Sequence, residues 1–215
     1  MSFVTLPLTR DGDGRPPIAG RERSPEVFVS YAQNLEDVML WRALGSETPG
    51  FYVDVGAAEP VADSVTKAFY DRGWRGINIE PMPSSFATLG AQRPRDVNLR
   101  VALEDVATRR NYFSIADQSG LSTGVRSLAD DYASMGLSVT EIAVDIDTLA
   151  GVCERHVEGP IHFLKIDTEG SEDLIIAGGD FTRFRPWVIL LESPEASRIP
   201  RRPTWHEPLV EAGYE

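Results

Sequence analysis

Two stretches decide the fold of this chain: FYVDVGA at Phe51–Ala57 and FLKIDTEGSE at Phe163–Glu172. Each begins as an apolar run of the length of a buried strand and ends in carboxylates and a glycine. In an open α/β sheet, ligands bind just beyond the carboxyl ends of the parallel strands. The two stretches therefore predict an α/β fold with an acidic site at that edge of the sheet.

Strands and helices alternate along the chain, as in a Rossmann-like, doubly wound and mostly parallel sheet. Besides Phe51–Val55, strands are expected at Arg75–Ile79, Val97–Ala102, Ile161–Ile166 and Trp187–Leu191. Helices are expected at Ser30–Leu44, Pro60–Asp71, Pro83–Gly90, Ser171–Ala177 and Asp147–His156, the last capped by Asp147. An insertion at Ser114–Val144 is expected to hold a helix near Ser127–Ser134 and a strand near Val139–Val144. Residues 1–25 lack periodicity and predict a flexible N-terminal arm before a single domain at residues 26–215.

Composition narrows the classes of function. The formal net charge of -12 argues against a nucleic-acid surface and against a polybasic contact with lipid. The single cysteine, Cys153, excludes an intrachain disulfide and a multi-cysteine metal site. No segment has the apolar length of a membrane span, and the start lacks a signal-peptide pattern. We therefore expect a cytoplasmic protein without stable membrane insertion.

The carboxylates at the strand ends indicate the kind of ligand. Asp54 and Gly56 open the first crossover, and Glu80 ends the second strand, where an acid typically binds ribose hydroxyls. The loop GAAEP at residues 56–60 lacks the glycine pattern of dinucleotide-binding proteins. Glu59 would also repel a pyrophosphate but favour a sulfonium or ammonium group. The pattern favours S-adenosylmethionine over a nicotinamide dinucleotide.

Several strings in order resemble the FkbM-type S-adenosylmethionine-dependent methyltransferases. They are SYAQNLED at residues 30–37, VDVG at 53–56, GWRGINIEP at 73–81 and FLKIDTEGSE at 163–172, with RPW at 185–187 and Glu192 after them. The resemblance covers residues 30–214 and implies the class I methyltransferase fold. It implies that Asp54 and Gly56 hold the methionine end of the cofactor and that Glu80 binds its ribose. Ala57 and Glu59 of the same loop are further candidates for contact with the cofactor. It also implies that Glu104 or Asp105 lies near the adenine amine.

The segment before the first strand resembles a lid over the same site. Its polar side chains are candidates for contact with the cofactor, and Tyr31 would suit a cation or a sugar. An ordinary amphipathic helix with a polar outer face is the alternative interpretation. The candidates are Tyr31, Gln33, Asn34, Glu36 and Asp37.

Methyl transfer to an alcohol needs a base for the departing proton. Asp167, at the end of its strand and also a cofactor contact, is the first choice, with Glu169 and Glu172 as helpers or acceptor ligands. The same three carboxylates could hold Mg²⁺ through oxygen ligands. Lys165 lies on the same strand face as Asp167 and is expected to pair with Asp54 or Glu192 without taking part in the chemistry. His162 is expected to be structural, and His206 is a weaker base candidate.

The resemblance implies a hydroxyl of a sugar as the methyl acceptor, in a glycan, an oligosaccharide or a glycosylated metabolite. A non-catalytic nucleoside-binding module that regulates a glycan-assembly partner is the alternative. An oxidoreductase is disfavoured by the missing glycines. The family's C-terminal strands have no counterpart after Glu207–Tyr214 in this sequence. Trp187–Leu191 would then form an apolar sheet edge, which predicts a homodimer or a swapped segment that covers it.

Overall fold

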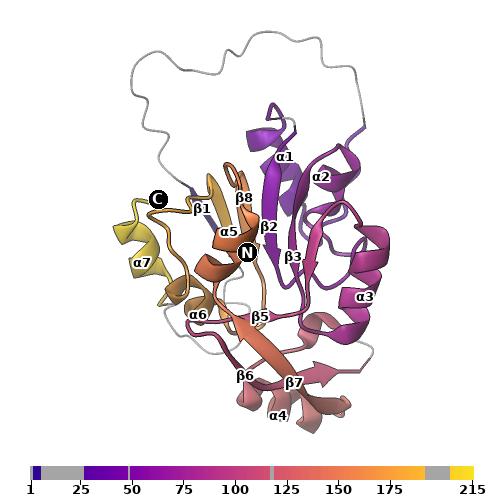
Figure 1. The fold of residues 1–215 in the computed structure, drawn as a ribbon. Coiled ribbons are helices and arrows are strands. Elements are labelled where there is room, and N and C mark those ends of the chain that lie inside the picture. Colours follow the sequence, from indigo (N-terminus) through magenta and orange to yellow (C-terminus); the bar gives the residue numbers. More distant parts are fainter. Residues whose placement is uncertain (1, 6–26, 48, 117–118, 192–203) are drawn as a thin grey trace.

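The computed structural model describes residues 2–5, 27–47, 49–116, 119–191 and 204–215. Its main sheet has the strand order β1-β9-β8-β2-β3-β4 (Figure 1). Five of these strands are parallel, and β1 pairs antiparallel with β9. The Rossmann-like fold class is therefore confirmed. The strands are β1 (Ser2–Thr5), β2 (Phe51–Val55), β3 (Arg75–Ile79), β4 (Val97–Leu99), β8 (Phe163–Ile166) and β9 (Val188–Leu191).

Alternation along the buried strands gives the sheet two apolar faces. Val53, Ile77 and Leu164 face a core built with α5 (Leu149–His156), α6 (Glu172–Ala177) and α7 (His206–Glu211). Tyr52, Phe163 and Leu190 face the opposite core, which packs against α1 (Glu36–Leu44) and α2 (Lys67–Asp71). Burial on both faces explains why these strands are mostly apolar, with Asp54, Asn78 and Lys165 as buried polar exceptions.

A second sheet of order β5-β7-β6 lies at the lower end of the molecule in Figure 1 and extends beyond the expected insertion Ser114–Val144 on both sides. Its strands are β5 (Ala102–Leu103), β6 (Thr108–Ile115) and β7 (Val139–Asp147), accompanied by η1 (Ser119–Leu121) and α4 (Arg126–Ser134). The expected strand Val97–Ala102 is thus divided between two sheets, and α3 (Pro83–Gln92) precedes it. Strands β6 and β7 pair antiparallel along the whole of β6.

Three expected helices begin later in the chain than predicted. The Asp37 carboxylate accepts hydrogen bonds from the Tyr31 and Ala32 amides and the Ser30 hydroxyl, so α1 begins only at Glu36. Residues 56–66 form a loop, and only Lys67–Asp71 of the expected helix is helical. The cap of α5 is the Thr148 hydroxyl, which accepts from the Gly151 amide; Asp147 still belongs to β7.

The outer edge of β9 is covered by β1 of the same chain, which pairs Ser2–Thr5 with Val188–Leu191. The structure therefore differs from the expectation that a second subunit or swapped segment covers this edge. Residues 2–5 of the expected N-terminal arm form this strand, and residues 6–25 lie outside the described part. Among the described helices, none combines the length and apolar character needed to cross a bilayer.

Candidate functional site

A cavity of about 650 Å³ lies at the carboxyl ends of β2, β3 and β8, where the second sheet meets the main sheet. Residues after these three strands line one side, and Tyr112 of β6 with Leu121 and Ser122 lines the other. Its described lining is rich in carboxylates, and Lys165 is the one lysine or arginine in it. The carboxylates in the lining are Glu36, Glu59, Asp63, Glu80, Asp167 and Glu169.

Lys165 organises the floor of this cavity. Its side chain is buried, and its Nζ lies 3.2 Å from Oδ1 of Asp54 and 3.5 Å from Oδ2 of Asp167. The same ammonium donates a hydrogen bond of 2.6 Å to the Gly56 carbonyl. Burial lowers the pKa of Lys165, but the two carboxylates more than offset this, and the net shift is upward. The expected pairing with Asp54 is present, whereas Glu192 lies outside the described residues.

Gly56 is required where the loop leaves β2. It has φ of 74°, and a Cβ built there would lie 1.9 Å from the Asp167 carbonyl oxygen. A side chain at this position would therefore separate the ends of β2 and β8 and combine a clash with backbone strain.

Glu80 is buried, with 5% of its surface exposed, and lines the cavity at the end of β3. Its two carboxylate oxygens accept hydrogen bonds from the amides of Ala58 (2.9 Å) and Met82 (2.7 Å). Burial raises the pKa of Glu80 to about 7 despite these hydrogen bonds. The carboxylate thus fixes the loop after β2 while facing the cavity, where it has further lone pairs for a ligand's hydroxyl groups.

Glu169 is the second carboxylate with a strongly shifted pKa. Burial, together with the charges of Asp167 and Glu172, raises the pKa of Glu169 to about 7. Its backbone has φ of 54°, a left-handed conformation that is unusual outside glycine. The buried Thr123 hydroxyl donates 2.7 Å to the Glu169 carbonyl, so the insertion holds this residue in place. Strain of this kind gathers where geometry matters for function.

Glu172 supports the turn that carries Glu169 and is not among the described residues that line the cavity. Its carboxylate accepts hydrogen bonds from the Thr168 amide and hydroxyl and from the Gly170 amide. In the structure the Glu172 carboxylate shapes this loop, and its expected catalytic role stays a prediction. Among the described residues, no three acidic, histidine or cysteine side chains gather as metal ligands. The Mg²⁺ site expected at Asp167, Glu169 and Glu172 thus does not form in the structure.

Nine of the residues predicted from the sequence line the cavity: Gln33, Asn34, Glu36, Gly56, Ala57, Glu59, Glu80, Asp167 and Glu169. Asp54 lies beneath the floor, where it accepts a hydrogen bond from Thr66 and pairs with Lys165. Tyr31 contacts Lys67 through its ring.

Three other residues expected to contact the cofactor are not among the described residues that line the cavity. The Asp37 carboxylate is bound by the turn before α1. Glu104 accepts a hydrogen bond from Tyr112 and pairs with Arg110, and Asp105 is exposed. Neither acid is among the described lining residues. Glu104 instead acts on the cavity indirectly, since it holds the Tyr112 phenol in the wall.

Sequence reasoning missed Tyr112 as a cavity residue, whereas it had placed Lys165 beside Asp167 and Asp54. Tyr112 is buried on β6 and lies among apolar partners such as Met82 and Ala102. The signal available in the sequence was weak, because the first half of β6 is exposed and polar. His162 has the structural role expected, since its Nδ1 accepts a hydrogen bond from the Phe51 amide.

Comparison with known proteins identifies a family. A family model described as the methyltransferase FkbM domain matches residues 54–207, most of the chain. No curated protein and no solved structure matches it. The matched range begins within β2, at Asp54, and includes β3, β8 and the second sheet, and therefore nearly all of the cavity.

Proposed function

The chain belongs to the FkbM methyltransferase family, and from that premise we propose that it is an S-adenosylmethionine-dependent O-methyltransferase. Its acceptor in this proposal is a sugar hydroxyl of a glycan, an oligosaccharide or a glycosylated metabolite. The observation that carries the proposal is one cavity with Glu80 and Glu169, both of pKa about 7, at the carboxyl ends of the strands.

The residues of the cavity suit this cofactor. When bound, S-adenosylmethionine supplies a methyl group on a sulfonium centre, which carries positive charge. Glu80 would accept hydrogen bonds from the ribose hydroxyls, and the loop of Gly56 and Ala57 would hold the methionine end. The surrounding carboxylates favour a cationic ligand by sign. A pyrophosphate-bearing cofactor would face the same carboxylates with Lys165 alone as a cation, and that ammonium is already shared by Asp54 and Asp167.

Glu169 is the best placed base for the acceptor. A general base works best when its pKa lies near the working pH, which holds for Glu169. Asp167 lies 3.5 Å from the Lys165 ammonium, an arrangement that suits orientation of the acceptor hydroxyl. Glu169 would accept the proton that the acceptor hydroxyl loses as its oxygen takes the methyl group from the bound cofactor. We therefore propose Glu169 as the base in place of Asp167, the first choice from the sequence.

Binding and transfer test the proposal separately. S-Adenosylhomocysteine should raise the melting temperature, whereas NAD should leave it unchanged. Radiolabel from methyl-labelled S-adenosylmethionine should appear on members of a panel of neutral oligosaccharides. Absence of S-adenosylhomocysteine binding would refute the proposal, and tight binding without transfer to any acceptor would favour a non-catalytic module instead.

A further inference from the structure

The loop that follows β2 contributes more to the cavity than any other segment, yet it has no regular structure of its own. It spans residues 56–66 and includes two non-glycine residues with positive φ, Ala58 (45°) and Asp63 (54°). Such conformations persist only where the surroundings hold them. Its described cavity-lining members are Gly56, Ala57, Ala58, Glu59, Ala62, Asp63 and Val65.

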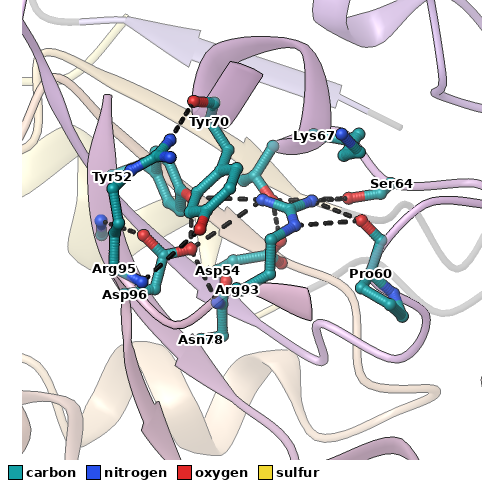
Figure 2. A network of polar contacts seen from close by, with 12 residues as sticks. Tyr52, Asp54, Pro60, Ser64, Lys67, Tyr70, Asn78, Arg93, Arg95 and Asp96 are labelled. Carbon is teal, nitrogen blue, oxygen red and sulfur yellow. Dashed lines mark hydrogen bonds and ion pairs between the residues drawn. The ribbon is translucent and has the colours of Figure 1, made fainter. Parts of the chain in front are cut away.

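Arg93 binds this loop at its centre, between the two strained residues. The guanidinium is 1% exposed and donates two hydrogen bonds to the Pro60 carbonyl, from Nε at 3.0 Å and Nη2 at 2.6 Å. Nη2 also donates 3.0 Å to the Ser64 hydroxyl. Figure 2 shows the guanidinium reaching Pro60 and Ser64 on one side and Tyr52 on the other.

The opposite side of Arg93 is anchored in the sheet. Asp96 lies 3.8 Å from Nη1 and accepts hydrogen bonds from the Tyr52 hydroxyl (2.6 Å) and the Asn78 amide (3.0 Å). The Tyr52 hydroxyl in turn accepts 3.3 Å from Nη1 of Arg93. Two strands, β2 and β3, therefore fix the arginine from which the loop is held.

Further hydrogen bonds connect Ser64 to the floor of the cavity. Ser64 lies 3.4 Å from the Thr66 hydroxyl, which donates 2.9 Å to Asp54. Asp54 pairs with Lys165, whose ammonium holds the Gly56 carbonyl. Both ends of the loop are thus tied to the sheet through Lys165 and Thr66, and its middle is tied through Arg93.

We propose that Arg93 is a positioning residue that sets the conformation of the loop 56–66 for cofactor binding. This rests on the proposed function, because the ligand whose affinity reports on the loop is S-adenosylhomocysteine. A planar guanidinium reaches the Pro60 carbonyl, Ser64 and Tyr52 at once, which the single ammonium of a lysine does not. Arg93→Lys keeps a positive charge beside Asp96 but loses the simultaneous contacts of the guanidinium to the Pro60 carbonyl, Ser64 and Tyr52.

The test compares Arg93→Lys with Tyr52→Phe in the full chain. Tyr52→Phe removes a hydroxyl from the anchored side and leaves the contacts to Pro60 and Ser64 in place. Arg93→Lys is expected to weaken S-adenosylhomocysteine binding by about tenfold in calorimetry, and Tyr52→Phe by less than about twofold. Denaturant unfolding of both variants separates affinity from stability. Ser64→Ala, which removes the contacts of this hydroxyl to Arg93 and Thr66, should fall between them.

Hydrogen exchange of the ligand-free protein gives a readout that does not involve the cofactor. Amides of residues 57–65 should exchange faster in Arg93→Lys than in the wild type, with the sheet amides unchanged. Unchanged exchange in this loop, or equal loss of affinity in Tyr52→Phe, would overturn the positioning role. A wild type that does not bind S-adenosylhomocysteine would refute the proposed function, while the exchange comparison would still decide whether Arg93 holds the loop.

Discussion

Replacing Glu80 by glutamine should stabilise the ligand-free protein at high pH and weaken cofactor binding. Glu80 is buried at the end of β3 and accepts the amides of Ala58 and Met82. Burial raises its pKa from 4.5 to about 7, so the folded protein tolerates the charge poorly. Glutamine has nearly the same shape but is neutral at every pH.

The sign and size of the expected stability change follow from the raised pKa of Glu80. Because the pKa in the folded state is the higher one, the folded protein binds this proton more tightly than the unfolded chain. The ionisation cost is absent below about pH 4.5, grows as the pH rises, and is complete above pH 7 at about 3 kcal/mol. At pH 5 only about 1 kcal/mol of it is present.

The substitution by glutamine also lowers the free energy of unfolding by an amount that does not depend on pH. It offers one oxygen and one NH₂ group to two amide donors, so one of the hydrogen bonds from Ala58 and Met82 is lost, at about 2 kcal/mol. Glu80→Gln is therefore expected to be about 1 kcal/mol more stable than the wild type at pH 8 and about 1 kcal/mol less stable at pH 5.

Urea unfolding followed by tryptophan fluorescence at pH 5 and pH 8 measures this reversal. Glu154→Gln is the matched control, because this glutamate is exposed and the same substitution should stay within about 0.5 kcal/mol at both pH values. Binding of S-adenosylhomocysteine at pH 8 should weaken about tenfold or more in Glu80→Gln, through loss of charged hydrogen bonds to the ribose. An equal effect on stability at both pH values would refute the assigned burial cost, and unchanged affinity would refute the contact with the ribose.

Three further substitutions test the remaining parts of the site. Glu169→Gln should lower kcat by about 100-fold and leave S-adenosylhomocysteine affinity within about twofold. It should also remove the rise of kcat through pH 7, since the ionised carboxylate is the base. A pH profile that keeps this rise would argue against that role. Lys165→Met should destabilise the protein by about 3–5 kcal/mol in denaturant unfolding, because Asp54 stays buried without its cation, and a loss below 1 kcal/mol would contradict the pairing. Gly56→Ala should abolish cofactor binding in calorimetry, since its Cβ would lie 1.9 Å from the Asp167 carbonyl. Normal binding by a folded Gly56→Ala protein would show that the loop relaxes.

The elements that sequence reasoning located best are the buried strands. The observed β2 and β3 have the predicted bounds, because runs such as Phe51–Val55 are apolar on both faces and end at a glycine or proline turn. Sequence order along parallel strands also placed Glu80, Asp167 and Glu169 at one edge of the sheet. These features depend on local composition and on a general rule of sheet topology.

What could not be read from the sequence depends on contacts between distant residues. The segment after Pro60 has a helix-like pattern, yet the loop persists because Arg93, 33 residues away, binds the Pro60 carbonyl. Glu104 follows a strand end like the cofactor acids, but the second sheet brings Tyr112 and Arg110 to it. A carboxylate at a strand end is therefore a candidate for contact with a ligand. The side chains that bind it in the folded protein determine its role.

The carboxylates around the cavity have two kinds of surroundings, and this difference supports the proposed methyl transfer. Asp54 and Asp167 share the ammonium of Lys165, which keeps negative charge at the floor in a fixed place. Glu80 and Glu169 lack such a cation at close range among the described ion pairs, and burial raises the pKa of both to about 7. A site that separates its acids in this way can hold charge in one position and exchange a proton in another near neutral pH. The lysine inside an otherwise apolar strand is thus what allows neighbouring acids of one cavity to have different roles.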